Sequence, residues 1–501
     1  MSIGRNVTAN YLGQAWTAVI GLVFIPVYIR YMGVESFGLI GVFTLLQAWL
    51  ALLDMGMTPT LNREMARFTA GAHTPQSIRD LLRSLELIAL AMSAAIGVLV
   101  WTAADWLAAD WLRVEKLPLE TVSQAIALMG LVVAMRFLEG LYRGAMLGLQ
   151  QQVLYNAANA FFATLRAAGA VAVLAWVAPT IGAYFAWQGI VSVLALAYMA
   201  VAAHRLLPPP PRPPRYSGRA VRDIWRFAGG MMATTFLVLL LMQVDKILLS
   251  RLLSLEAFGY YALAATVASA IGLMVSPVTQ AFFPRFSEIV ARDDEQELAR
   301  AYHRGAQLVT TLAAPAALVL IFFSERILDL WTGDRVLAGE VAPLLTLLAA
   351  GALLNGLMMI PYMLTLACGW PGFAVRVNAV AVAVLVPAIV WATVNHGAAG
   401  AAWAWVLLNA GYVLIGIRYL HRRLLPQEMW TWYRQDVALP LAGAAAVAAA
   451  CAAMAPHVGA GLGTLLLLIS AGAGSSMLAA MLSPALRQPM LERLASAFAP
   501  R

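Results

Sequence analysis

The chain has 501 residues, of which 62% are hydrophobic and 12% are charged, and its mean hydropathy is +0.78. A soluble domain is about half apolar and about a quarter charged, so this chain has too little polar surface to cover a water-soluble particle of its size. A soluble enzyme is excluded, and no polar stretch is long enough to form a large soluble head on a single anchor. The sequence therefore predicts an all-α polytopic membrane protein.

Apolar stretches recur along the whole chain. A helix needs about 20 apolar residues to cross the hydrocarbon core of a bilayer. Fourteen stretches meet this requirement, at 11–29, 37–58, 84–103, 121–141, 153–177, 180–202, 227–248, 258–281, 305–323, 341–366, 373–394, 398–418, 437–455 and 460–482. The first is too long for the apolar core of a signal peptide and has no small-residue cleavage site, so we interpret it as a span. Only Ala178 and Pro179 separate the fifth span from the sixth.

The distribution of basic residues predicts the orientation of the chain. With the N-terminus in the cytoplasm, the inner segments hold 24 of the 33 Lys and Arg residues and the outer segments hold 7. Because Lys and Arg concentrate in cytoplasmic loops, this bias favours an even number of spans and both termini in the cytoplasm. It also explains the formal net charge of +8 without nucleic acid as a partner.

Short motifs repeat along the chain at offsets of 218 to 221 residues. The pairs are VESFG at 34–38 with LEAFG at 255–259, IGAYFAW at 181–187 with AGAAWAW at 399–405, and HRLLP at 204–208 with RRLLP at 422–426. Several matches at a near-constant offset indicate two homologous halves of six spans, in the same orientation. We therefore predict an N-lobe at 1–206, a Pro-rich cytoplasmic linker at 207–222, a C-lobe at 223–425, and spans 13 and 14 with a cytoplasmic tail at 426–501.

Proline and glycine predict the linker and the hinges. The run LPPPPRPPRY at 207–216 is typical of an extended polyproline II spacer, with a ligand for an SH3-type domain as the less favoured alternative. Gly56 and Pro277 occupy equivalent places in the repeat. Breaks at these two positions would let spans 2 and 8 bend.

The segment 25–67 resembles the opening of the Wzx-type polysaccharide (O-antigen) flippases, which belong to the multidrug/oligosaccharidyl-lipid/polysaccharide exporter superfamily. The family pattern runs from a proline late in span 1, through an aromatic residue, an arginine and Phe-Gly, to Asp-x-Gly and a basic residue after span 2. The matching residues are Pro26, Tyr28, Arg30, Gly33, Phe37, Gly38, Asp54, Gly56 and Arg63. The segment 243–264, with Asp245 late in span 7, resembles the second-half counterpart, and the resemblance covers roughly the first 425 residues.

The resemblance implies a V-shaped exporter fold with two pseudo-symmetric six-helix lobes plus a C-terminal helix pair, and it implies a transporter rather than an enzyme. The implied activity is export of an undecaprenyl-diphosphate-linked oligosaccharide repeat unit across the bacterial inner membrane by alternating access, for O-antigen or other surface polysaccharide. The implied partners are the lipid-linked glycan, membrane lipids, a polysaccharide polymerase and a chain-length regulator. No cofactor is expected, apart from coupling to an H+ or Na+ gradient.

Polar residues inside the predicted spans indicate a hydrated cavity in the N-lobe. A charged side chain at mid-membrane costs about 2.5–3.5 kcal/mol by insertion measurements, so it usually faces a cavity or a partner. Spans 1, 2, 4 and 5 carry polar residues at helical spacing, which places them on one face of each helix. The candidate substrate-binding residues are Arg136, Arg166, Arg143, Asn156, Asn159, Gln47, Arg30, Arg63 and Arg376. The candidates for ion coupling are Asp54, Glu139 and Asp245.

The sign of the intramembrane charge favours an anionic substrate. A guanidinium group matches the paired oxygens of a diphosphate through two parallel hydrogen bonds. Arg166 lies near the middle of its span and has no acidic partner on its own helix, so we expect it to face the cavity. The polyprenyl tail would stay in lipid, against spans 13 and 14.

The charged positions also have structural interpretations. Arg136, Glu139 and Arg143 have the spacing of an ion-pair ladder that stabilises only their own helix. Asp54 could cap a helix or pair locally with Arg63.

Two other functions stay open. A small-molecule or multidrug cation antiporter of the same superfamily should carry a carboxylate as its main intramembrane charge, whereas here arginines compete with carboxylates. A membrane glycosyl-transfer enzyme would need acidic or His-rich outer loops. Those loops offer little beyond four acidic residues, which are Asp105, Asp110, Glu115 and Glu120.

Overall fold

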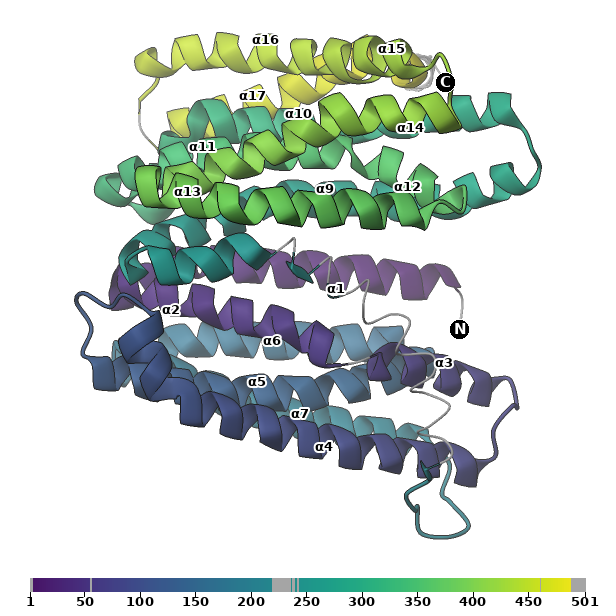
Figure 1. Cartoon of the computed structure of the whole chain (residues 1–501). Coiled ribbons are helices and arrows are strands. Elements are labelled where there is room, and N and C mark those ends of the chain that lie inside the picture. The colour runs from purple at the N-terminus through teal and green to yellow at the C-terminus, as the bar shows by residue number, and fades with distance from the viewer. Residues whose placement is uncertain are drawn as a thin grey trace, which may run out of the picture. The chain divides into compact units, whose positions relative to one another are not determined.

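The computed structural model describes residues 3–54, 56–218, 236, 239–240, 243–459 and 461–487. All named elements among these residues are helical (Figure 1). The chain divides into two compact units, Met1–Gly259 and Tyr260–Arg501. The division into lobes and a linker remains a prediction from the repeat, and the end of that linker, 219–222, lies outside the described residues.

The first unit is a bundle of long helices. Its elements are α1 (Ile3–Val23), α2 (Ile25–Leu53), α3 (Met57–Thr69), α4 (Pro75–Trp106), a π-helical turn (Leu107–Trp111), α5 (Leu119–Gly148), α6 (Gln152–Trp176), α7 (Ile181–Leu206) and the start of α9 (Leu255–Ala291). The separate α6 and α7 confirm that the fifth and sixth predicted spans are distinct helices.

Two glycines interrupt the path from α1 to α3. The helix is broken at Gly33, whose φ of 80° is open to glycine and strained for a residue with a Cβ. A second break at Gly56, with φ of 76°, ends the predicted span 37–58 early and starts α3. The matching break expected at Pro277 is wrong, because α9 continues through that proline. Proline removes one backbone hydrogen bond of the helix, and the remaining hydrogen bonds keep a long helix such as α9 intact.

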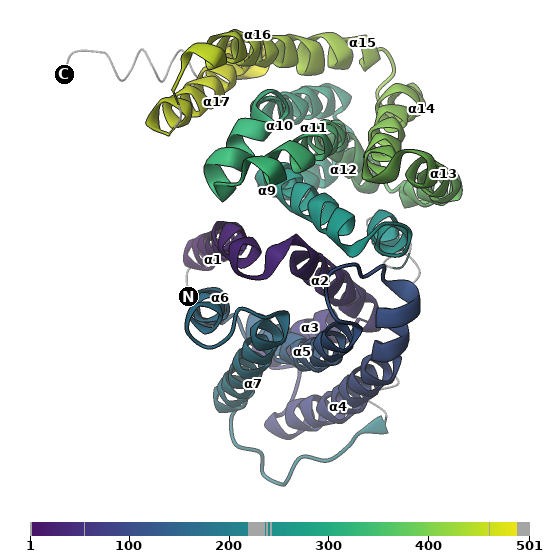
Figure 2. The ribbon, with the colours of Figure 1, turned by 90° about the vertical axis from the view of Figure 1, so that its left-hand side faces the viewer.

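Helix α5 lies at the centre of the first unit. It packs against α3, α4 and α7, and Figure 2 shows it between α4 and α7. Glycines permit its close approach to α3, since a Cβ on Gly144 would lie 2.7 Å from the carbonyl oxygen of Thr58 and one on Gly148 would lie 2.3 Å from that of Asn62. This contact holds the start of α3 beside the polar residues of α5.

The two copies of the repeated motif VESFG/LEAFG cross each other in the first unit. A Cβ atom on Gly38 would lie 2.3 Å from the carbonyl oxygen of Leu255. Reciprocally, a Cβ on Gly259 would lie 2.6 Å from the carbonyl oxygen of Val34. Each glycine therefore faces the first residue of the other copy, and the backbones approach more closely than side chains would allow.

The loop before α5 bridges the same two motif copies. The carboxylate of Glu35 accepts the backbone N–H of Lys116 at 3.0 Å, and the Lys116 ammonium lies 2.5 Å from the carboxylate of Glu256. The hydrogen bond to Glu256 and the charge of that residue raise the pKa of Lys116. Glu35 is 4% exposed, so these contacts satisfy a buried carboxylate.

The Pro-rich linker follows α4 as far as Gly218. The guanidinium of Arg79 donates to the backbone carbonyls of His204, Leu207 and Pro208 at 2.7–3.0 Å. Three residues of α4 accept backbone N–H groups of the linker, in the pairs Gln76 with Arg212, Asp80 with Arg215, and Ser84 with Ser217. The linker backbone is thus hydrogen-bonded within its own chain, as a fixed spacer requires.

The second unit contains the remaining helices. They are the rest of α9, α10 (Glu295–Thr332), α11 (Arg335–Leu357), α12 (Met359–Ala367), α13 (Pro371–Gly411), a π-helical turn (Tyr412–Gly416), α14 (Ile417–Leu424), α15 (Met429–Thr431), a second π-helical segment (Trp432–Ala438), α16 (Leu439–Met454), a 3-10 turn (Ala455–His457) and α17 (Leu462–Leu482). Helix α10 is central and packs against α11, α16 and α17.

A buried polar network joins the predicted spans 13 and 14 to α10. Asp436 is fully buried, and its carboxylate lies 2.5 Å from Nδ1 of His303 and accepts a hydrogen bond from Gln307 at 2.8 Å. Gln307 in turn accepts the backbone N–H of Ala485 at 2.8 Å. A buried carboxylate without such partners would be costly, so these contacts fix how the C-terminal helices pack.

Helix α13 folds back on itself at Gly397, whose φ of 60° and ψ of −147° only glycine adopts readily. Gly400 then packs against the backbone of Ala392, whose carbonyl oxygen would lie 2.1 Å from a Cβ at residue 400. The predicted spans 373–394 and 398–418 are therefore the two arms of one antiparallel hairpin.

The described residues contain eleven helices that are long and apolar enough to cross a membrane. One of these, Arg376–Leu424, contains the α13 hairpin and corresponds to two predicted spans. The predicted span 227–248 lies largely outside the described residues, apart from its helical end at 243–248. An all-helical, multi-span architecture is confirmed.

Helices α9 and α10 differ from the prediction in length. The predicted spans 258–281 and 305–323 leave a polar segment at 283–304, for which the sequence predicts a loop. Instead both helices continue into it and turn only at Arg292–Asp294. Ion pairs of Arg285 with Glu288 and Glu297 stabilise helical structure beyond the apolar stretches.

Candidate functional site

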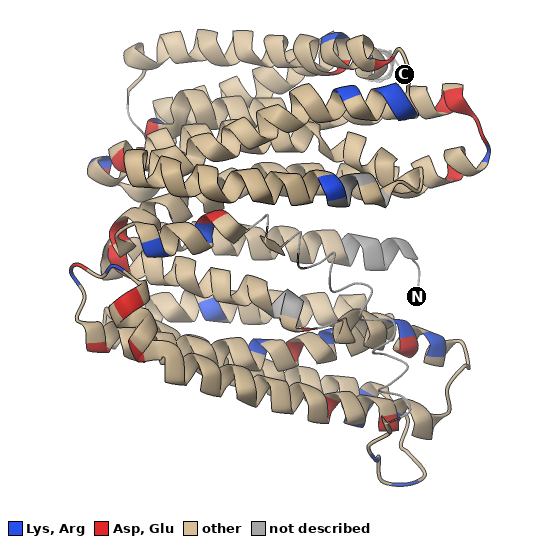
Figure 3. Ribbon diagram, viewed as in Figure 1, with Lys and Arg blue, Asp and Glu red and all other residues tan. Residues whose placement is uncertain are grey.

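Charged residues gather toward the helix ends in the described parts of the chain, and the stretches between them are largely uncharged (Figure 3). A polar cavity of about 460 Å³ inside the first unit is an exception. Its lining comes from α2, α3, α5 and α6, and consists of Gln47, Asp54, Thr58, Pro59, Arg136, Phe137, Glu139, Gly140, Arg143, Tyr155, Asn159 and Arg166. Three guanidinium groups face two carboxyl groups here, a formal excess of one positive charge.

Arg136 is held by groups from two other helices. Its guanidinium donates to the side-chain oxygen of Gln47 on α2 and, at 3.3 Å, to that of Gln188 on α7. Its Cζ atom lies 5.2 Å from the centre of the Phe43 ring, a cation–π distance. The Nε atom is buried and has no partner among the described residues. A bound oxygen acceptor could satisfy this donor.

Arg166 pairs with the helix beside it. Its Nη2 atom lies 2.9 Å from Oε2 of Glu139 on α5, and the two side chains are 13% and 15% exposed. Glu139 therefore links α5 to α6 instead of forming the ladder along α5 that its spacing with Arg136 and Arg143 predicts. The Nε atom of Arg166 is also buried without a partner in the described part of the chain.

Asp54 closes the cavity at the turn between α2 and α3. Its carboxylate accepts the Thr58 hydroxyl at 2.6 Å and the Thr58 backbone N–H at 3.2 Å. These bonds satisfy donors in the first turn of α3, so the capping interpretation of Asp54 describes its contacts. Arg143 lines the same cavity, and its charge acts on both Asp54 and Tyr155.

Several candidates lie elsewhere. Asn156 donates to Asn10 at 2.6 Å and packs against Gly13, so it joins α6 to α1 outside the cavity. Arg63 pairs with its neighbour Glu64 at 3.3 Å on the exposed side of α3.

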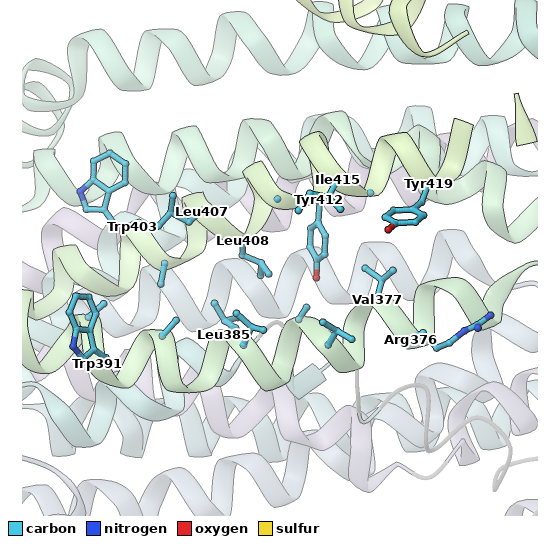
Figure 4. Close-up of a pocket in the computed structure, with 18 of the residues that line it drawn as sticks. Arg376, Val377, Leu385, Trp391, Trp403, Leu407, Leu408, Tyr412, Ile415 and Tyr419 are labelled. Carbon is cyan, nitrogen blue, oxygen red and sulfur yellow. The ribbon is translucent and has the colours of Figure 1, made fainter. Parts of the chain in front are cut away.

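The remaining candidates are also absent from the cavity lining. Arg30 is exposed just before the break at Gly33, and Asp245 lies 3.6 Å from the ammonium of Lys246. Arg376 belongs to the second unit, where it lines an apolar groove (Figure 4). The cavity thus brings together Gln47, Asp54, Arg136, Glu139, Arg143, Asn159 and Arg166, and not the other five candidates.

Several residues of the site were not predicted from the sequence, among them Gln188, Tyr155 and Phe43. Gln188 is an isolated amide in an apolar span, whereas Gln47 was predicted from polar residues at helical spacing on its span. Tyr155 lies one turn before Asn159 on α6, so helical spacing would have placed it on the cavity face. Phe43 carries no signal of its own, since a phenylalanine in a span ordinarily faces lipid or core.

Comparisons with known families agree on a membrane transporter. A family model described as polysaccharide biosynthesis protein matches residues 3–290, and one described as MatE matches residues 231–391. A Shigella flexneri protein named "Putative O-antigen transporter" is 20% identical over 416 residues, which are 82% of this chain and 96% of that protein.

Solved structures share the fold. A lipid II flippase MurJ in an inward closed conformation matches with a TM-score of 0.70 at 11% identity, covering 96% of this chain and 98% of that one. An inward-facing multidrug resistance MATE family transporter matches with a TM-score of 0.61 at 12% identity, covering 87% of this chain and 96% of that one. At these identities the likeness concerns the fold alone.

The chain is a multi-pass membrane protein from a family of transporters rather than of enzymes. The first family model spans more than half of its length. As the motifs at 25–67 predicted, the protein belongs to the polysaccharide biosynthesis protein family.

Proposed function

We propose that this protein exports an undecaprenyl-diphosphate-linked oligosaccharide repeat unit across the bacterial inner membrane for surface polysaccharide synthesis. The observation that carries the proposal is the positively charged cavity in the first unit. Membership of a polysaccharide biosynthesis family and similarity to the Shigella flexneri protein support the same substrate class. A polysaccharide polymerase and a chain-length regulator are the protein partners that such an activity would need.

The chemistry of the cavity supports an anionic headgroup. The guanidinium groups of Arg136 and Arg166 each keep a buried Nε donor without a partner among the described residues. A diphosphate offers several charged oxygens at the spacing of two parallel hydrogen bonds. In a site shielded from water such charge-assisted bonds are strong, and the sugar hydroxyls would find the polar groups of Asn159 and Tyr155 in the same cavity.

The cation antiporter remains the second candidate, since the MatE family model matches residues 231–391. A cationic drug would need a carboxylate free to receive it. In the cavity Glu139 is paired with Arg166, and Asp54 accepts two hydrogen bonds from Thr58. The positive excess therefore supports the anionic substrate.

We infer that the headgroup moves by alternating access between the cytoplasmic and outer sides. The excess of basic residues in the predicted inner segments supports cytoplasmic termini, so the substrate would enter from the side on which it is made. Among the three candidates for H+ or Na+ coupling, Asp54 and Glu139 line the cavity and Asp245 does not. Only Asp54 and Glu139 are therefore candidates for coupling, and the neutral variant Asp54→Asn separates a coupling role of Asp54 from its role as a helix cap.

The decisive experiment measures surface glycan export in cells whose chromosomal gene is replaced by variants. Arg136→Ala and Arg166→Ala should each lower export about tenfold to a hundredfold, the effect of losing one charge-assisted hydrogen-bonding group. Arg300→Ala, an exposed arginine outside the cavity, is the matched control and should export normally. Cells without the gene should accumulate the lipid-linked glycan on the cytoplasmic face.

The same cells distinguish the antiporter. If export is unchanged in both arginine variants while drug tolerance falls on deletion, the flippase assignment is wrong. Variants are compared at equal membrane abundance, so that loss of folded protein is not mistaken for loss of binding.

A further inference from the structure

The second unit holds an apolar groove between the two arms of the α13 hairpin. The first arm runs from Pro371 to the reversal at Gly397, and the second arm continues through the π-helical turn into α14. The groove between the arms has a volume of about 1110 Å³, above the range of about 300–1,000 Å³ for small-molecule pockets (Figure 4). The groove is elongated along the two arms and is not a rounded cavity.

The lining is aliphatic and aromatic over most of this length. Leu385, Leu408 and Tyr412 line its middle from both arms (Figure 4). Large side chains are left uncovered by protein, with Leu407 66% exposed. Such a surface is stabilised by contact with hydrocarbon.

Charge is confined to one end of the groove. The lysine, arginine, aspartate and glutamate residues among its lining are Arg376 and Arg423 alone, on the two arms. The guanidinium of Arg423 lies 4.3 Å from the centre of the Trp370 ring, a cation–π contact that holds it at the mouth. Arg376 donates through Nε to the carbonyl of Gly372 at 3.1 Å, which leaves its other guanidinium donors available.

We propose that this groove is a second binding site for the anionic polyprenyl lipid, separate from the cavity of the first unit. The isoprenoid chain lies in the groove and its phosphate is held between Arg376 and Arg423. A groove that follows the length of two arms suits a single long chain better than the paired chains of a phospholipid. The two arginines supply planar, paired donors for phosphate oxygens at the end where the chain would carry its headgroup. This inference rests on the proposed function for the identity of the lipid. In this second site the chain lies on α13 and α14, instead of against the predicted spans 437–455 and 460–482.

The experiment is photo-crosslinking of the purified full-length protein in lipid nanodiscs. The probe is a polyprenyl diphosphate with a diazirine on its isoprenoid chain, and adducts are mapped by mass spectrometry. Labelling should fall on the two arms, and excess unlabelled polyprenyl diphosphate should compete while phosphatidylglycerol does not. If phosphatidylglycerol competes with the probe as well as polyprenyl diphosphate does, the groove is an ordinary lipid-facing surface and the proposal is wrong.

Two matched pairs of variants test the geometry. Ala388→Trp fills the groove and should lower labelling at least about tenfold, whereas Val390→Trp, on the same arm but outside the lining, should not. Arg376→Gln with Arg423→Gln should weaken probe binding by a similar factor, and Arg418→Gln, on α14 outside the lining, should not. Unchanged labelling in Ala388→Trp contradicts the proposal.

Failure here is distinguishable from failure of the export function. Crosslinking reports binding in the second unit and requires no transport. If the groove variants bind the probe normally while Arg136→Ala still lowers glycan export, the groove site is wrong and the export function stands. If the groove binds the probe but the cavity variants export normally, the error lies in the headgroup site.

Discussion

The α-carbon of Gly38 lies against the backbone carbonyl of Leu255, so that a Cβ atom at residue 38 would be 2.3 Å from that oxygen. No ordinary contact between a Cβ and an oxygen is that short. The two residues belong to the two copies of one repeated motif, and Gly259 repeats the relationship toward Val34. The two copies of the repeated motif therefore contact each other reciprocally. In each copy the glycine allows close approach to the backbone of the other copy.

Substituting this glycine should loosen the crossing. Because the neighbour is backbone and cannot rotate away, Gly38→Ala should cost about 1–3 kcal/mol of unfolding free energy. Gly21→Ala is the matched control, since nothing lies within 4 Å of its added Cβ, and alanine should there be neutral or stabilising. Denaturant unfolding of the purified protein in detergent measures the unfolding free energy of both variants. Equal changes in the two variants would disprove the close contact between Gly38 and Leu255.

The ion pair between Arg166 and Glu139 should show a strong energetic coupling. Glu139→Ala leaves a mostly buried guanidinium without its partner, and should cost about 3 kcal/mol. The double variant Glu139→Ala/Arg166→Ala should be less destabilised than Glu139→Ala alone, because no orphan charge remains. A double-mutant cycle on unfolding in detergent gives the coupling, and strict additivity would mean that the two side chains do not interact.

Gln188, which the sequence reasoning passed over, offers a test of the cavity charge. Gln188→Glu would set a carboxylate against Arg136 and cancel the positive excess. The fold should be kept, because a buried arginine gains a partner, while binding of a polyprenyl diphosphate should weaken about tenfold. Gln188→Met removes the hydrogen bond without adding charge, and should weaken binding less. Equal binding in the two variants would show that net charge does not govern the site.

Asp54 should act through its cap. Asp54→Ala removes the acceptor of the Thr58 N–H and hydroxyl, and should lower the unfolding free energy by about 1 kcal/mol. Asp54→Asn keeps an acceptor oxygen and should restore most of that stability together with glycan export. A stable Asp54→Asn protein that no longer exports would instead assign Asp54 to ion coupling.

The Pro-rich linker should become more mobile when Arg79, which binds its backbone carbonyls, is replaced. Arg79→Ala abolishes three bonds to backbone carbonyls, so the linker should open more often and tryptic cleavage after Arg215 should accelerate about tenfold or more. Arg83→Ala, on the same helix and exposed, is the control and should leave the cleavage rate unchanged. Equal rates would show that Arg79 does not hold the linker.

The sequence alone predicts the helical membrane-spanning architecture and most of the charged residues that line the cavity. Membrane spans are long apolar runs, because lipid cannot satisfy the polar groups of any other spanning structure except a closed barrel, so composition and run length predict them. Mid-membrane charge is costly, and that cost identified Arg136, Arg143, Glu139 and Arg166 as cavity residues before any contact was known.

Only the tertiary structure decided which groups meet. Helical periodicity assigns a residue to an arc of its own helix and contains no information on the facing helix. Asn156 and Asn159 share one predicted face of α6, yet the first bonds to α1 and the second lines the cavity. The partner of Glu139 lies on α6 instead of α5, and the groove on α13 exists because a single glycine, Gly397, turns one apolar run back on itself.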